Sequence, residues 1–253
     1  MRRRLTAIIF VLTISIIFSG CASQQELVFK SVEGKTHSAV TPVQQTAKWA
    51  VSWWGPRQEA VNKRLKEGNV DLLWIGDSIT HGWENRGKKI WDTYYAPRNA
   101  VNMGFSGDRT EHVLWRLDHS NFENISPKLA IIMIGTNNSN GKDNTAEEIA
   151  DGIITICQRL RTRFPKMKIL LLAIFPRNPK PSAQREKNAE ASLLASNIAD
   201  GKTIYYMDIN QKFLTDDGTL TKDIMPDFLH PNETGYKIWA EAIESKVAQL
   251  MGE

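Results

Sequence analysis

Cysteine is scarce in this chain, because Cys21 and Cys157 are the only two among its 253 residues. A framework of several disulfides is therefore excluded, and no Cys-x-x-Cys pair is present to hold zinc. Cys157 ends the apolar stretch 153–157, which is typical of a helix that faces a core. We expect its thiol to be buried and unreactive rather than nucleophilic.

Several other functional signatures are also missing. The chain has no Gly-x-x-x-x-Gly-Lys-Ser/Thr phosphate loop and no His-Glu-x-x-His zinc motif, and the glycine pair in 104–107 is too short for a dinucleotide fingerprint. The net charge of +4 owes much to Arg2, Arg3 and Arg4, since 29 basic and 28 acidic residues remain when residues 1–20 are set aside. We therefore expect no metal, no cofactor and no nucleic-acid surface.

The N-terminus has the pattern of a bacterial lipoprotein signal. Three arginines precede an apolar run of 14 residues, 5–18, which is shorter than the roughly 20 residues that a membrane-spanning helix needs. The run ends in Phe-Ser-Gly-Cys at 18–21, which resembles a lipobox with cleavage before Cys21 and lipidation of that residue. A secretory signal without lipid and an uncleaved anchor are the alternatives.

This pattern predicts where the protein resides and how it is divided. We expect a signal peptide over 1–20, a lipidated Cys21 with a flexible tether over 21–48, and one folded domain over 49–253. The tether is expected because 22–48 is poor in large apolar residues and rich in Ser, Gln, Thr and Lys. Ala22 weakly favours the outer membrane of the cell envelope over the inner one.

Five short apolar runs alternate with helical patterns in the predicted domain. The runs are 70–75, 100–103, 129–134, 169–174 and 204–207, and the helical patterns are 58–67, 110–117, 145–163, 183–199 and 235–250. Most of the runs are almost continuously hydrophobic, as strands buried on both faces are. The alternation predicts a three-layer α/β/α domain around a five-stranded parallel sheet.

Small and polar residues cluster where these runs end. Gly-Asp-Ser opens 76–80, a glycine pair lies in 104–108, Gly-Thr-Asn-Asn occupies 135–138, and an Asp-x-x-His unit lies in 227–231. Each cluster alone is ordinary turn or cap chemistry. Together they supply every group that acyl transfer needs, at the strand ends where ligands bind to parallel sheets.

The roles follow from what each group can do at neutral pH. Ser78 needs a base to act as a nucleophile, and His230 is the candidate because histidine titrates near neutrality. Asp227 is close enough in sequence to fix the tautomer of that imidazole. The backbone amides of Ser78 and Gly107 and the side-chain amide of Asn137 are the candidates for stabilising the oxyanion.

These four clusters, in this order, resemble the blocks of the SGNH (GDSL) hydrolase superfamily. A closer likeness, carried by 107–117, 144–148 and 176–188, is to the catalytic subunits of intracellular platelet-activating-factor acetylhydrolase. The resemblance implies a flavodoxin-like sheet of order 2-1-3-4-5, a metal-independent esterase mechanism and the site roles given above. Those subunits are cytosolic and lack a lipobox, so their lipid substrate and regulatory partner do not carry over directly.

Three functions are compatible with these residues. We favour an esterase that removes a short acyl group, in the first place acetyl, from a carbohydrate or similar polar alcohol. The second is a lysophospholipase or platelet-activating-factor-type acetylhydrolase that acts on lipids, and the third a non-catalytic binding protein that keeps the fold. Trp83 and Trp91 either offer faces for sugar stacking or pack in the core.

Overall fold

The structure is a computed structural model that describes residues 23–253, and a parallel sheet lies at its centre. The strands run in the order β2-β1-β3-β4-β5. Their bounds are β1 Leu72–Gly76, β2 Ala100–Gly104, β3 Leu129–Met133, β4 Lys168–Leu172 and β5 Ile204–Met207. The predicted parallel sheet and its 2-1-3-4-5 order are confirmed, with strand ends within two residues of those expected from the sequence.

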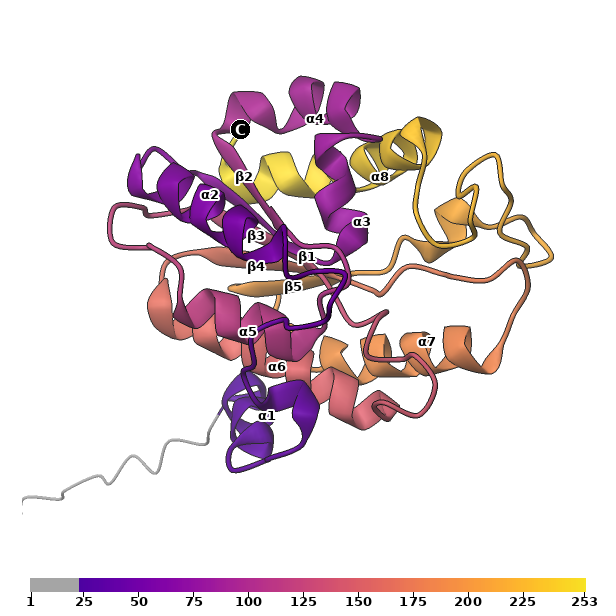
Figure 1. Ribbon diagram of the computed structural model, residues 1–253, viewed down its shortest axis with the longest axis horizontal. Helices are drawn as coiled ribbons and strands as arrows, with labels where there is room; N and C mark the ends of the chain where they lie inside the picture. Colours follow the sequence, from indigo (N-terminus) through magenta and orange to yellow (C-terminus); the bar gives the residue numbers. More distant parts are fainter. Residues whose placement is uncertain (1–22) are drawn as a thin grey trace, which may run out of the picture.

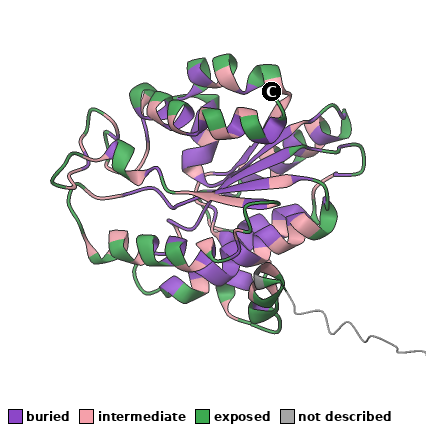
Figure 2. Ribbon diagram, turned by 180° about the vertical axis from the view of Figure 1, so that it is seen from behind, coloured by how far each residue is buried: buried purple, intermediate pink, exposed green. Residues whose placement is uncertain are grey.

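Side chains of each strand alternate between two hydrophobic clusters, one on either face of the sheet. Leu73 and Ile75 of β1 belong to one cluster, whereas Leu72 and Trp74 belong to the other. This alternation is the period of two that strand geometry imposes. Figure 2 shows the strands almost wholly buried between layers of helix whose outer faces are exposed, so the runs are apolar because both faces are covered.

Helices form the two outer layers of the domain. On one face lie α5, α6 and α7, and on the other lie α4 and α8, while α2 packs beside the edge strand β2 (Figure 1). The helices are α1 Gln24–Val32, α2 Trp54–Lys66, α3 Ser78–His81, α4 Lys88–Tyr94, α5 Thr110–Asp118, α6 Ala146–Arg163, α7 Ala183–Ser196 and α8 Glu233–Met251, with short 3-10 turns η1 Ser38–Val40, η2 Gly82–Glu84, η3 Ala96–Arg98 and η4 Asn210–Phe213.

The segment predicted to be a flexible tether is instead folded onto the domain from residue 23 onward. Helix α1 contacts α6, and Phe29 and Val32 pack against the core on that side. Lys35 and His37 both reach Asp151 of α6, with Lys35 Nζ 2.6 Å and His37 Nε2 3.0 Å from its Oδ2. The prediction was wrong because a few apolar residues and two paired side chains suffice to dock a polar segment.

Two predictions concern residues outside the described part of the chain. The signal peptide over 1–20 and the lipidated Cys21 both lie there. Within residues 23–253, none of the helices combines the length and the apolar character that crossing a bilayer would require.

A buried ion pair joins the loop after β2 to two helices. Arg116 of α5 donates from Nε to Asp108 Oδ2 at 2.7 Å, and Trp54 of α2 donates from Nε1 to Oδ1 at 2.7 Å. Neither charged side chain is exposed, and the guanidinium lies over Phe105, 4.0 Å from the ring centroid. Burial raises the pKa of Asp108 to about 6, against the opposing effects of Arg116 and Trp54.

Removing the cation should therefore destabilise the fold in a pH-dependent way. We expect Arg116→Met to lower the free energy of unfolding by about 3 to 5 kcal/mol at pH 8. The folded variant must either bury an unpaired carboxylate, at a cost that does not depend on pH, or take up a proton on it, which costs more at pH 8 than at pH 5. Protonation therefore limits the loss at pH 5 more than at pH 8. Urea unfolding at the two pH values measures this loss.

The double variant Asp108→Asn, Arg116→Met is the control, because it removes both charges and should recover much of the stability. An equal loss at pH 5 and pH 8 in Arg116→Met would show that lost packing, and not an unpaired charge, causes the effect.

Candidate active site

Ser78 stands at the point where β1 turns into the short helix α3. Asp77 is the N-cap of that helix, and its Oδ1 accepts a hydrogen bond of 2.9 Å from the amide of Ile79. A Cβ on Gly76 would lie 2.1 Å from Oγ1 of Thr80 and 2.4 Å from the carbonyl of Met133. Only glycine allows this turn to be so tight, and the turn places Ser78 at the carboxyl end of the sheet.

Helix α3 is held from the other side by α8. The hydroxyl of Tyr236 donates a hydrogen bond of 2.6 Å to the carbonyl of Ile79. Asn102 of β2 also donates, from Nδ2 to the carbonyl of Thr80 at 3.0 Å. Two separate elements, α8 and β2, thus fix the backbone that carries Ser78.

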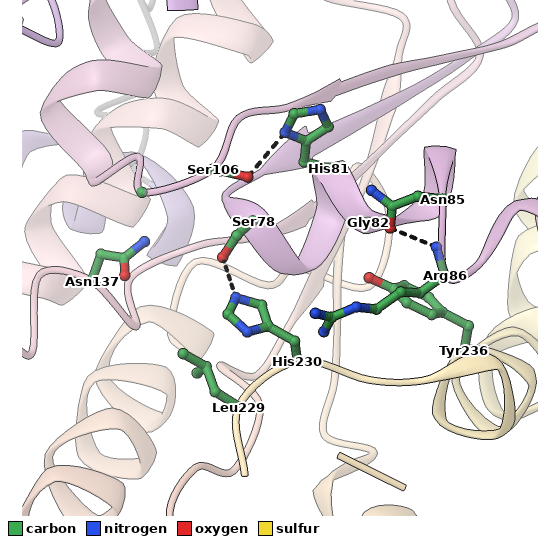
Figure 3. Close-up of a pocket in the computed structure, with 11 residues that line it drawn as sticks. Ser78, His81, Gly82, Asn85, Arg86, Ser106, Asn137, Leu229, His230 and Tyr236 are labelled. Carbon is green, nitrogen blue, oxygen red and sulfur yellow. Dashed lines mark hydrogen bonds between the residues drawn. The ribbon is translucent and has the colours of Figure 1, made fainter. Parts of the chain in front are cut away.

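His230 and Asp227 lie in the loop before α8, and this loop brings them to Ser78. Nε2 of His230 is 2.8 Å from Oγ of Ser78, and its Nδ1 is 2.7 Å from Oδ2 of Asp227. The other carboxylate oxygen of Asp227 accepts the amides of Leu229 and His230, at 3.1 and 2.8 Å. Figure 3 shows the Ser78 and His230 side chains pointing toward each other.

The charge of Asp227 orients the imidazole. Partial burial raises the pKa of this carboxyl, but the hydrogen bonds from His230 outweigh that effect and hold the pKa below its usual value. A carboxylate that stays charged at neutral pH favours the proton on Nδ1 of His230. Nε2 is then the acceptor for the hydroxyl of Ser78.

Gly107 and Asn137 reach the same cavity from the neighbouring strand ends. Gly107 has a φ of +74°, a conformation that favours glycine, and Asn137 donates from Nδ2 to the carbonyl of Asp108 at 2.9 Å. Within residues 23–253, the amides of Ser78 and Gly107 have no hydrogen-bond acceptor. The structure thus brings together all five predicted residues, and their catalytic roles stay predictions.

The cavity has a volume of about 450 Å³, and most of its lining residues carry polar side chains. It is lined by Ser78, His81, Gly82, Asn85, Arg86, Ser106, Gly107, Asn137, Leu229, His230 and Tyr236. His81 lines the cavity with its Nδ1 3.0 Å from Oγ of Ser106. Burial lowers the pKa of His81 to about 4, so this ring is neutral at pH 7.

Sequence reasoning did not find Arg86, Asn85 or Tyr236. Asn85 and Arg86 follow the turn η2, and no sequence pattern marks such a turn as lying beside the cavity. Tyr236 falls within the predicted helix 235–250, where nothing in the sequence separates it from a residue that packs on the core.

Two other sequence interpretations are settled by burial. The thiol of Cys157 is buried, which confirms the prediction, and burial raises its pKa to about 12. Trp83 is fully buried in an aromatic cluster with Trp74 and Trp239, and Trp91 packs on Trp74. Packing in or against the core is therefore confirmed for both, and a stacking role for Trp83 is wrong. No group of three or more possible metal ligands gathers anywhere in 23–253.

The arrangement has the parts of a serine hydrolase, namely a hydroxyl, an imidazole and a carboxylate in series beside available amides. A model of the GDSL-like lipase/acylhydrolase family matches residues 74–238. The chain belongs to this family. The matched region spans all four clusters, from the first strand to the loop that holds Asp227 and His230.

Relatives of this GDSL-like hydrolase include subunits of platelet-activating factor acetylhydrolase IB. The alpha2 subunit of Rattus norvegicus is 38% identical over 189 residues, covering 74% of this chain and 80% of that protein. The alpha1 subunit of Homo sapiens is 32% identical over the same shares.

Solved structures agree in fold. The chain aligns with an acetylxylan esterase of Geobacillus stearothermophilus at a TM-score of 0.56 and 18% identity, covering 73% of this chain and 95% of that one. A carbohydrate acetylesterase of Sinorhizobium meliloti aligns at 0.56 and 22%, covering 72% and 100%. Family and relatives together make the protein a carboxylic ester hydrolase.

The pair of Asp227 and His230 gives a direct test of the candidate site. We expect Asp227→Asn to lower kcat on p-nitrophenyl acetate by about 10² to 10⁴, because the amide no longer holds the proton on Nδ1 of His230. Steady-state kinetics at pH 8 measure the loss. Asp223→Asn is the matched control, since Asp223 is an exposed carboxyl in the same loop region outside the cavity. Equal rates in the Asp227 variant and the wild type would remove Asp227 from the mechanism.

Proposed function

We propose that the protein removes acetyl groups from esters of carbohydrates through an acyl-enzyme formed on Ser78. The observation that carries the chemistry is the contact of 2.8 Å between Oγ of Ser78 and Nε2 of His230. Such a contact lets the imidazole accept the serine proton as the hydroxyl attacks.

The proposed reaction has two halves. Oγ of Ser78 attacks the carbonyl carbon of the ester while its proton passes to Nε2 of His230. The oxyanion receives hydrogen bonds from the amides of Ser78 and Gly107 and from Nδ2 of Asn137. When the intermediate collapses, the sugar oxygen leaves with the proton from Nε2. Water then repeats these steps on the acyl-enzyme and releases acetate.

The lining of the cavity supports a short acyl group on a polar alcohol. Leu229 is the only aliphatic side chain among the lining residues of the described chain. A long acyl chain would find only this one aliphatic side chain to pack against, whereas hydroxyl groups of a sugar meet polar side chains such as Asn85, Ser106 and Arg86. The named activities of the two esterases with a similar fold point the same way.

A second candidate is an acetylhydrolase of the platelet-activating-factor type that acts on lipids. Two observations favour it. The relatives that are 38% identical carry that name, and Arg86 places a guanidinium at the cavity, where the phosphate of a phospholipid would find a partner.

Acetate release separates the two candidates. We expect the purified protein to release acetate from acetylated xylooligosaccharides with a kcat/KM at least about tenfold above that for platelet-activating factor, because polar side chains line the cavity and Leu229 is its one aliphatic lining residue. On p-nitrophenyl esters the rate should fall steeply between acetate and octanoate. Ser78→Ala is the control and should abolish both activities.

A preference for platelet-activating factor would favour the second candidate. Full activity of Ser78→Ala would overturn the mechanism itself.

We further propose that Cys21 is lipidated after cleavage and holds the enzyme at the bacterial cell envelope. The support is the lipobox-like sequence 18–21 behind an apolar run of signal-peptide length. Cys21 is the only cysteine in the lipobox-like sequence, so replacing this one residue tests the proposal.

Cell fractionation tests the anchor. We expect the wild-type protein to be found in the membrane fraction and to incorporate radioactive palmitate. The Cys21→Ser variant should neither fractionate with the membrane nor incorporate palmitate. Cys157→Ser is the matched control and should label as the wild type does. Labelling that survives in Cys21→Ser would contradict the proposal.

A further inference from the structure

Trp49 is an unusual side chain to find at the surface. It is 56% exposed, and the other large exposed hydrophobic residues in 23–253 are aliphatic: Leu27, Val43, Val51 and Leu193. It also lies before residue 74, outside the region that matches the family. An exposed indole is a large apolar face left uncovered, so its surroundings bear on function.

The indole of Trp49 lies directly against Gly107. A Cβ built on Gly107 would be 2.1 Å from Cη2 of that ring, so the ring occupies the space that a larger residue would need. Gly107 lines the candidate active site. The exposed indole therefore adjoins a lining residue of the cavity that is also one of the proposed oxyanion donors.

The position of the ring is fixed by its neighbours. Nε1 of Trp53 donates to the carbonyl of Trp49 at 3.1 Å, and the two rings lie 6.1 Å apart at 32°. The ring of Trp53 in turn lies 5.8 Å from that of His81, at 34°. We call Trp49, Trp53 and His81 the aromatic row. It runs from the exposed indole to a lining residue of the cavity.

The geometry of the reaction indicates which part of the substrate lies beside the aromatic row. With the carbonyl oxygen of the substrate at the amide of Gly107, the alcohol part of the ester must leave the cavity across its rim. The exposed side chain that lies against Gly107 is Trp49. One face of a sugar ring presents mainly C–H groups, and such a face is complementary to a flat indole, while the hydroxyl groups keep their contacts with water and polar side chains.

We propose that Trp49 is the platform for the sugar ring that carries the acetyl ester. This inference rests on the proposed carbohydrate esterase function and names the residue that gives it selectivity. It assigns a substrate-binding role to the segment before the first strand, a role that the catalytic residues do not supply.

Two substrates isolate this role. Acetylated xylotriose offers a sugar ring, and ethyl acetate offers the same acyl group without any ring. We expect Trp49→Ala to lower the ratio of kcat/KM for acetylated xylotriose to that for ethyl acetate about tenfold, mainly through a higher KM for the sugar ester. Trp49→Phe should restore most of the ratio, because it keeps an aromatic face.

Val51→Ala is the matched control, since Val51 is 63% exposed in the same segment but is not the side chain that lies against Gly107. This variant should keep the wild-type ratio. A wild-type ratio in Trp49→Ala would overturn the platform while the proposed function stands. An equal fall in kcat on both substrates would also overturn it, because that result would show that Trp49 only holds Gly107 in position and does not bind the sugar. A wild-type enzyme that cleaves ethyl acetate but no sugar ester would overturn the proposed function, and the platform with it.

Discussion

The buried ion pair of Asp108 and Arg116 fixes the loop on which the candidate site depends. Asp108 follows Gly107 directly, and its carbonyl accepts the hydrogen bond from Asn137. Two of the proposed oxyanion donors are thus positioned by one residue whose carboxylate is held from α5 and, through Trp54, from α2. A charge withdrawn from water is costly unless it is fully paired. Here the buried pair holds the loop after β2, which carries Gly107 and Asp108, in one position.

Much of the fold and the core of the site follow from sequence because they depend on local pattern. Runs such as 129–134 are apolar on both faces, which only a covered parallel strand explains, and residues that follow such runs must meet at one edge of the sheet. That geometry brings Ser78, Gly107 and Asn137 together. His230 lies in the loop before α8, 152 residues from Ser78, and its chemistry rather than a strand end identified it. Asp227 could be predicted from sequence spacing alone, because it lies three residues before His230 in the same loop.

The features that escaped prediction depend on tertiary contacts. Nothing local distinguishes Trp49 from Trp54, yet one is 56% exposed beside Gly107 and the other 1% exposed on the ion pair. Arg86 lines the cavity because α4 and α8 bring its turn there. The docking of the N-terminal segment escaped prediction for the same reason, since Gln25 bonds to Ile198 and Lys35 to Asp151, both more than 100 residues away.

The docked N-terminal segment sets how far the enzyme can act from a surface. A free chain over 21–48 would give a reach of roughly 30 Å. With α1 folded onto α6, only Ala22 and Ser23 separate Cys21 from the first helix. If Cys21 carries lipid as proposed, the domain works in contact with the bilayer surface and in a restricted orientation. Its substrates are then molecules that arrive at, or are released beside, the membrane, and polymers held tens of ångströms away are out of range.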